Sequence, residues 1–165
     1  MADRTDTFYA ADAIHGYGAQ ILVGDGASPE TFQAVAQIRR ITFGDMSTAV
    51  IDKTHLRSPA AHREKLMGLR DSGPFSIEGI YDPNDESISN TGGGSGSFVS
   101  GGLLAMWIAR SEHNFVLRLN DGSPATELPF RGSVSKFQPG EVGADDLITF
   151  TAEITPLQDF SSDLP

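Results

Sequence analysis

Several short segments of the chain alternate between apolar and polar residues, and this period of two is typical of β-strands with one buried face. Glycine-containing turns, such as residues 24–26 and 120–122, separate these segments. We therefore expect short antiparallel strands joined by tight turns. The segments predicted as strands are residues 20–23, 32–43, 75–81, 115–119, 128–135 and 147–154.

The segment at residues 32–43 breaks the strict alternation. Val35 and Ile38 are both apolar but lie three positions apart. One extra residue in a strand moves the following side chains to the other face and bends the strand. We therefore predict a bulge or a bend near Gln37.

One further segment shows helical spacing, with apolar residues three and four positions apart. These residues are Val99, Leu103, Leu104, Trp107 and Ile108. Ser97 or Ser100 is the expected N-cap. We expect Leu103, Leu104 and Trp107 to form the helix face that packs on the core. The whole pattern predicts a mainly β fold, an antiparallel β-sandwich with one flanking α-helix.

Residues 44–73 show little of either pattern, and we interpret them as a long loop after the second strand. A loop of this length is uncommon in a compact domain and is usually functional. Ser58 followed by Pro59 is a typical helix start, so one or two helical turns are expected there. The loop holds five of the 12 lysines and arginines, namely Lys53, Arg57, Arg63, Lys65 and Arg70.

Composition narrows the class of protein. The chain has 165 residues and no cysteine; we expect a single domain without disulfides, thiol nucleophiles or cysteine-bound metals. Its net charge of −10 argues against a protein that coats DNA. No apolar run approaches the ~20 residues that cross a bilayer, and the first residues lack a signal-peptide pattern. We therefore expect synthesis in the cytoplasm and no membrane anchoring.

The motifs of the sequence do not support an enzyme. The glycine-rich stretch at residues 92–97 lacks the Gly-Lys-Ser/Thr ending of a phosphate-binding loop. No serine stands in a Gly-x-Ser-x-Gly elbow, and the four histidines have no metal-ligand spacing. We expect no catalytic residue, no cofactor and no metal.

Charge is unevenly distributed along the chain. Residues 141–165 carry six acidic residues and no basic one, whereas residues 53–70 are net positive. One interpretation is that this separation only keeps a monomer soluble. The other is that the basic loop of one copy meets an acidic surface of another, a role in which complementary charge is effective.

The order of motifs along the chain leads to a known family. In order, the motifs are residues 75–79, 82–84, 102–107, 115–119, 120–122, 130–135 and 146–155. This set resembles lambda-type siphophage major tail tube proteins, whose fold is shared with the tube proteins of type VI secretion. The resemblance covers about residues 19–156. Residues 91–97, which are rich in glycine, and the more basic long loop depart from the family pattern.

The resemblance implies a structural virion protein. Members of the family form hexameric rings that stack into a hollow tail tube, through which DNA leaves the capsid. The inner sheets of six subunits join into a central β-barrel, and the long loop contacts the neighbouring ring. Here residues 1–18 would be an N-terminal arm, residues 44–73 the stacking loop and residues 156–165 a C-terminal tail of one domain, residues 1–165.

Two sets of candidate site residues follow from this resemblance. The expected ring-stacking contacts are Lys53, His55, Arg57, Arg63, Lys65 and Arg70. A wall that passes DNA without binding it should be acidic or hydroxyl-rich, because lysine and arginine hold phosphate. The expected lumen-facing residues are Ser76, Glu78, Thr149, Thr151 and Glu153. The alternative is that the two glutamates are solvated on the outside of the tube.

The resemblance also implies the partners. They are further copies of the chain and tape-measure, tail-tip and tail-terminator proteins, with DNA only in transit, and the expected location is the virion tail. A secretion-system tube of the same fold is one alternative. A small β-sandwich module that binds carbohydrate or a receptor is an alternative from another class, and it should expose a cluster of aromatic residues on its loops.

Overall fold

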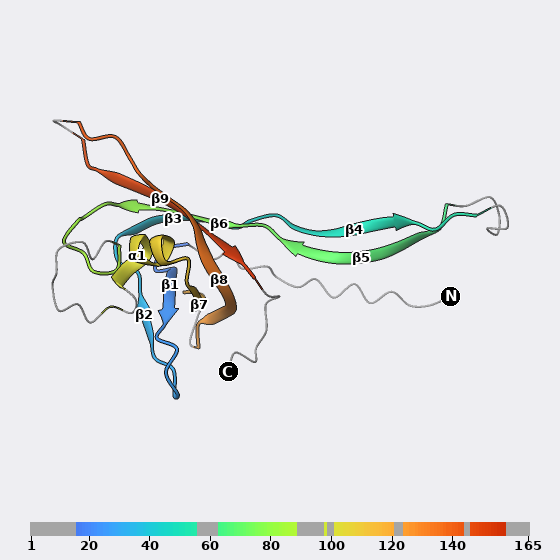
Figure 1. Cartoon of the computed structure of the whole chain (residues 1–165), viewed down its shortest axis with the longest axis horizontal. Coiled ribbons are helices and arrows are strands. Elements are labelled where there is room, and N and C mark those ends of the chain that lie inside the picture. The colour runs from blue at the N-terminus through green and yellow to red at the C-terminus, as the bar shows by residue number, and fades with distance from the viewer. Residues whose placement is uncertain are drawn as a thin grey trace, which may run out of the picture.

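The computed structural model describes residues 16–55, 63–88, 98, 101–120, 124–143 and 146–157. Within these residues the chain forms nine strands and one helix (Figure 1). In chain order they are β1 (Gln20–Gly24), β2 (Phe32–Ala34), β3 (Ile38–Thr42), β4 (Met46–Asp52), β5 (Lys65–Ser72), β6 (Phe75–Ile80), α1 (Gly102–Ala109), β7 (Glu112–Leu119), β8 (Thr126–Pro139) and β9 (Thr149–Pro156).

Seven of the strands form one antiparallel sheet in the order β2-β1-β7-β8-β9-β6-β3. The fold is therefore mainly β, as expected, but its core strands belong to one sheet rather than to the two stacked sheets of a sandwich. The edge strands β2 and β3 follow each other in the chain, so the sheet curls until its two edges are neighbours, without closing into a barrel. The expected rings and central barrel concern the assembly, which a single chain does not contain.

The bend predicted near Gln37 is the point where the chain passes from one sheet edge to the other. Gln37 has a φ of 56°, in the left-handed region that few residues other than glycine adopt. Its carbonyl accepts a hydrogen bond from the Ile80 amide at 3.1 Å. The register between β3 and β6 also shifts between Ile38 and Arg40. The broken alternation of residues 32–43 thus marks a change of sheet edge.

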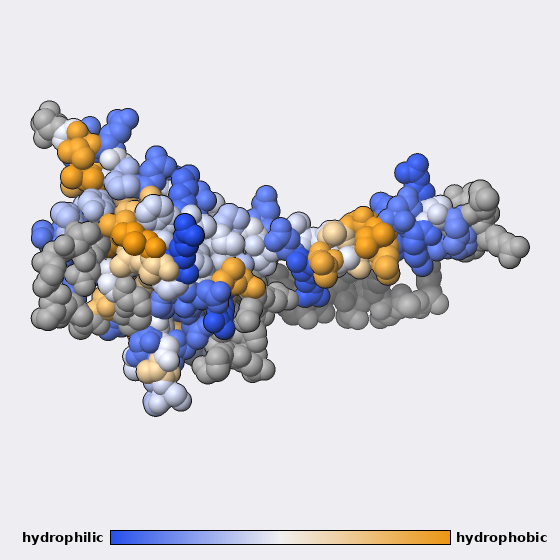
Figure 2. Space-filling view, viewed as in Figure 1, coloured by the Kyte–Doolittle hydropathy of each residue, from blue (hydrophilic) through white to orange (hydrophobic). Residues whose placement is uncertain are grey.

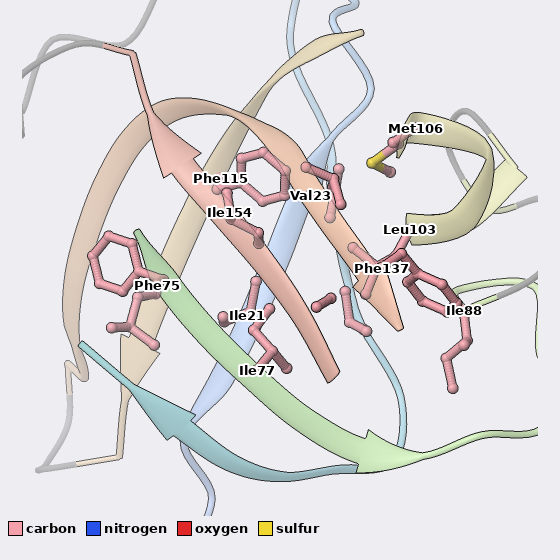
Figure 3. Close-up of a cluster of buried hydrophobic side chains, with 14 of the residues drawn as sticks. Ile21, Val23, Phe75, Ile77, Ile88, Leu103, Met106, Phe115, Phe137 and Ile154 are labelled. Atoms are coloured by element: carbon pink, nitrogen blue, oxygen red, sulfur yellow. The ribbon is translucent and has the colours of Figure 1, made fainter. Parts of the chain in front are cut away.

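The core lies inside the curled sheet and is rich in aromatic rings (Figure 3). Phe130 stacks on Phe75 and on Phe115, with ring centroids 4.8 and 5.5 Å apart. On β9, Phe150 and Ile154 point into this core, as the alternation predicts. Such ring pairs add stability beyond the area they bury.

Helix α1 covers one opening of the curled sheet (Figure 3). Leu103 is fully buried, and Leu104 packs partly against the core. Trp107 differs from the expectation, because its side chain remains 43% exposed while Met106 is fully buried. The helix turns Met106 rather than Trp107 toward the sheet. With eight residues it is too short to cross a membrane, and no helix among the described residues is long and apolar enough to do so.

The start of α1 also differs from the expected serine cap. Its N-cap is Gly101, with no side-chain hydrogen bond; Ser97 and Ser100 lie outside the described residues. Instead, the amides of Leu103 and Leu104 donate to backbone carbonyls of residues 87 and 88, each at 3.0 Å. A remote backbone segment thus satisfies the amides that a helix start leaves unpaired.

The segment at residues 44–73 is a β-hairpin and not an irregular loop. β4 and β5 pair with each other in a separate two-stranded sheet. This hairpin projects away from the main sheet along the longest axis of the molecule (Figure 1). Residues 56–62, with Ser58, Pro59 and the predicted helical turns, lie outside the described residues. So do most of the predicted N-terminal arm and C-terminal tail.

Candidate assembly surfaces

The β4–β5 hairpin, residues 44–73, exposes apolar side chains on both of its faces. Val50 lies opposite Met67, and Ile51 lies opposite Leu66 in the register. Since successive residues of a strand point to opposite faces, the first pair belongs to one face and the second pair to the other. All seven residues of β4 are exposed, and these four side chains keep between 51% and 71% of their surface in contact with solvent.

Such a hairpin points to an interface. An isolated two-stranded ribbon is marginally stable in water, and exposed apolar patches mark surfaces that bind other proteins or membranes. Fully burying one side chain of this size contributes about 1.5–3 kcal/mol. The hydrophobic patch is visible in the middle of the hairpin (Figure 2). These apolar residues did not predict strands in the sequence, because they do not alternate with polar ones.

The predicted ring-stacking residues fall mainly at the free end of this hairpin. Lys53 and Lys65 lie at the last paired positions, and Lys53 forms an ion pair with Glu64 at 3.3 Å. His55 and Arg63 follow beyond the strands and are exposed. Arg70 lies nearer the main sheet, opposite Thr48, and Arg57 lies outside the described residues. The structure thus gathers four of the six at one place.

Hydrogen bonds hold the backbone at this free end. The Asp52 carboxylate accepts the Thr54 amide at 2.8 Å, and bonds from Thr54 lower the pKa of this carboxyl. The Glu64 amide donates to the Thr54 hydroxyl at 3.0 Å, while the Lys53 amide donates to the Glu64 carbonyl. The charged residues are therefore carried on a hydrogen-bonded end of the hairpin.

A second protrusion is the turn between β8 and β9, residues 140–148, which we call the acidic turn. Val142 is 78% and Leu147 is 66% exposed. Glu141 and Asp146 flank these two apolar residues. Two backbone hydrogen bonds fix the base of the turn. The Gly140 amide donates to the Thr149 carbonyl at 2.6 Å, and the Tyr81 amide donates to the Ile148 carbonyl at 2.8 Å. The pairing of apolar and acidic residues in one turn was a signal available in the sequence.

The five predicted lumen-facing residues lie together on the outward face of two neighbouring strands, β6 and β9. Ser76 is opposite Glu153, Glu78 is opposite Thr151, and Thr149 is opposite Ile80 in the register. All five are partly exposed. The alternation of apolar and polar residues was sufficient to place them on one face, and whether that face lines a lumen stays a prediction.

This outward face, however, is less acidic than the sequence suggests. The carboxylate of Glu78 lies 3.5 Å from the guanidinium of Arg40 on β3. The carboxylate of Glu153 lies 3.3 Å from the ammonium group of Lys136 on β8. Sequence reasoning missed both cations, because strands that are neighbours in the sheet are distant in the chain. The face is balanced in charge and also carries hydroxyl groups.

Two further features of the described part of the chain bear on other kinds of site. In it, no three histidine, aspartate or glutamate residues are grouped so that they could hold a metal ion. The groove beside the exposed face of α1 is lined by Trp107, Ile108, Arg110 and residues 133–135.

The comparisons with known proteins give the fold. No protein-family model and no curated protein matches the sequence. A chain in the tail of an empty GTA particle, refined as a helix with C6 symmetry, has a TM-score of 0.59 and 14% identity, covering 86% of this chain and 93% of that chain. A chain from the virion of a native gene transfer agent (GTA) particle has a TM-score of 0.57 and 13% identity, covering 85% and 93%. This chain therefore has a fold that is also found in chains of gene transfer agent particles.

Proposed function

We propose that this protein is a structural subunit of a phage-type tail tube that assembles from stacked hexameric rings and conducts DNA out of the particle. The observation that carries the proposal is the β4–β5 hairpin with apolar residues exposed on both faces. A chain of the same fold occurs in a tail with C6 symmetry. A projecting ribbon that must be covered on two sides is suited to a subunit surrounded by copies of itself.

The energetics favour assembly in many copies over a simple dimer. Association of two proteins costs about 4–15 kcal/mol in lost freedom of motion. One hairpin face offers a few half-exposed apolar side chains, each worth less than the ~1.5–3 kcal/mol of complete burial, so it does not exceed that cost. In stacked rings each hairpin has both faces covered, and symmetry repeats each contact in every subunit.

The proposed path for DNA rests on the outward face of β6 and β9. A lumen must pass phosphate without binding it, and cations would hold phosphate. On this face the carboxylates of Glu78 and Glu153 pair with the cations of Arg40 and Lys136. The proposal includes a location in the virion, tape-measure, tail-tip and tail-terminator proteins as partners, and no enzymatic activity.

Electron microscopy of the purified protein tests the proposal. We expect rings or tubes in negative stain at high protein concentration. The matched variant Val50→Asp with Met67→Asp places two charges on one hairpin face and leaves the core intact, so it should stay monomeric with an unchanged thermal midpoint. A wild-type protein that stays monomeric at all concentrations, also in the presence of tail-tip proteins, would rule out the tube.

A further inference from the structure

We propose that the described residues of the acidic turn, 140–143 and 146–148, form the surface on a neighbouring copy that receives the described free end of the β4–β5 hairpin, residues 52–55 and 63–65. This inference rests on the proposed function and deepens it by naming both sides of the contact. Three observations support it. Both protrusions expose apolar residues, their charges are complementary, and they lie at opposite ends of the molecule.

Exposed apolar residues occur in both protrusions. On the hairpin, Ile51 and Leu66 form an apolar pair directly before the charged free end. On the acidic turn, Val142 and Leu147 expose 78% and 66% of their surface. Small apolar areas ringed by charged residues are the usual composition of the centre and rim of a protein interface.

The charges around the two apolar areas are of opposite sign. The described residues of the acidic turn include the two carboxylates of Glu141 and Asp146 and no basic residue. The described free end of the hairpin carries Lys53, Arg63 and Lys65 against two carboxylates, those of Asp52 and Glu64. Opposite charges steer two surfaces toward each other and exclude wrong pairings.

The two protrusions lie at opposite ends of the longest axis of the molecule (Figure 1). Hydrophobic residues are visible at the acidic turn and in the middle of the hairpin (Figure 2). The hairpin and the acidic turn of one copy therefore cannot meet, whereas those of two copies can. Such a contact is head-to-tail, and a head-to-tail contact adds copies without limit unless the rotation closes a ring. This is the kind of contact that a growing stack requires.

The described residues at the base of the acidic turn are held in place by hydrogen bonds. Two backbone hydrogen bonds fix its base, from Gly140 to Thr149 and from Tyr81 to Ile148. An added Cβ on Gly143 would lie 3.0 Å from the carboxylate of Asp146, so the two sides of the turn are close together. Holding the base of the turn in place reduces the entropy that is lost when the partner docks.

Cross-linking of assembled protein tests the contact. Because the chain has no native cysteine, only the introduced thiols can react. Leu66→Cys places a thiol on the hairpin, and Val142→Cys places one on the acidic turn. We assemble a mixture of the two single variants and add a short bis-maleimide. We expect a cross-linked dimer from the mixture, a ladder of oligomers from the double variant, and at least tenfold less product from either single variant alone.

The matched control places the second cysteine at an exposed site outside the acidic turn. Leu157→Cys, on a residue that is 48% exposed, mixed with Leu66→Cys should give no more product than the single variants. If tubes form and the Val142→Cys mixture gives no more dimer than this control, the contact is wrong and the tube proposal stands. If the wild-type protein forms no tubes, both proposals fail.

A charge exchange gives a second measurement that does not depend on thiols. Glu141→Lys with Asp146→Lys should slow assembly at low salt by about tenfold or more, because it reverses the attraction. Combining it with Lys53→Glu and Lys65→Glu should restore at least part of the rate. Assembly at the wild-type rate with the acidic pair reversed would overturn the contact.

Discussion

Gly44 and Gly73 lie so close together at the base of the β4–β5 hairpin that a Cβ atom on Gly44 would overlap the carbonyl group of Gly73. The same added atom would lie 2.6 Å from the Pro74 carbonyl oxygen. Next to this contact, the Gly73 amide donates to the Asp45 carbonyl at 2.9 Å. The absence of a side chain at Gly44 therefore allows the two chain segments to enter the hairpin side by side.

Gly44→Ala should open the base of the hairpin. The backbone has to shift to accommodate the methyl group, at a cost of about 1–3 kcal/mol for a tightly packed site. Because each 1.4 kcal/mol is a factor of ten, we expect the Gly73 amide to exchange with solvent about tenfold faster or more. Gly16→Ala is the control, since an added Cβ there has no neighbour within 4 Å. Equal exchange in both variants would contradict the close contact.

The burial of α1 gives a prediction on stability. Leu103 is fully buried, so Leu103→Ala should lower the free energy of unfolding by about 2–5 kcal/mol. Trp107→Ala should cost clearly less, because that side chain is 43% exposed. Urea unfolding of both variants checks the order. A larger loss for Trp107→Ala than for Leu103→Ala would mean that Trp107, and not Met106, packs against the core.

Strands β6 and β9 of the curled sheet could be predicted because each buries one face in the monomer. In β9, for example, Phe150, Ala152 and Ile154 are buried, and the intervening residues are not. The same rule fails for the hairpin. Its strands contain the adjacent apolar pairs Val50–Ile51 and Leu66–Met67, since both faces are apolar and neither is covered within one chain. Alternation predicts strands that bury one face within a single domain. It therefore does not detect a strand whose two faces are both apolar and are covered only in an assembly.

Features that depend on contacts between distant parts of the chain could not be predicted from the sequence either. The helix start relies on backbone carbonyls of residues 87 and 88, which have no sequence signature. The cations beside Glu78 and Glu153 come from strands that are neighbours only because of the sheet order. Local alternation predicts which side a residue faces, and topology decides what stands beside it.

His113 makes stability depend on pH. Burial lowers the pKa of this histidine, while the Glu30 carboxylate raises it by a smaller amount, and one of its ring nitrogens lies 2.8 Å from the Ser111 hydroxyl. The unfolded chain, with a pKa near 6.5, therefore binds the proton more readily than the folded chain. The stability contributed by neutral His113 is present above that pH and is lost as the pH falls below it.

A comparison with His113→Gln isolates this effect from the carboxylates. Between pH 7.5 and pH 5, the wild-type protein should lose more stability in urea than the variant, in which this group does not titrate. Parallel curves for the two proteins would show that His113 has no part in the pH dependence.

Charge reversal at the hairpin tests the predicted stacking contacts. Arg57→Glu with Arg63→Glu should block tube growth and leave the monomer folded. An exposed charge such as that of Arg63 contributes about 0–1 kcal/mol to stability, but it recurs in every subunit. The measurements are electron microscopy for tubes and thermal unfolding for the monomer. Arg131→Glu, whose parent arginine pairs with Glu112 at 2.9 Å on the main sheet, is the control. Normal tubes from the double variant would exclude these two residues from stacking.

The last prediction concerns the outward face of β6 and β9, and it follows from the ion pairs on that face. Glu78 and Glu153 neutralise Arg40 and Lys136, at 3.5 and 3.3 Å. Replacing both glutamates with lysine removes this neutralisation and adds two further cations per subunit. If the face lines the lumen, DNA phosphate binds there strongly and genome delivery falls on the order of tenfold or more, whereas tubes form normally because surface ion pairs add little stability. The control is Glu127→Lys, whose parent glutamate pairs with Arg118 at 2.7 Å on other strands of the sheet. Infectivity equal to the control would place Glu78 and Glu153 on the outside of the tube, whereas a delivery defect that weakens at high salt would place them on its inner wall.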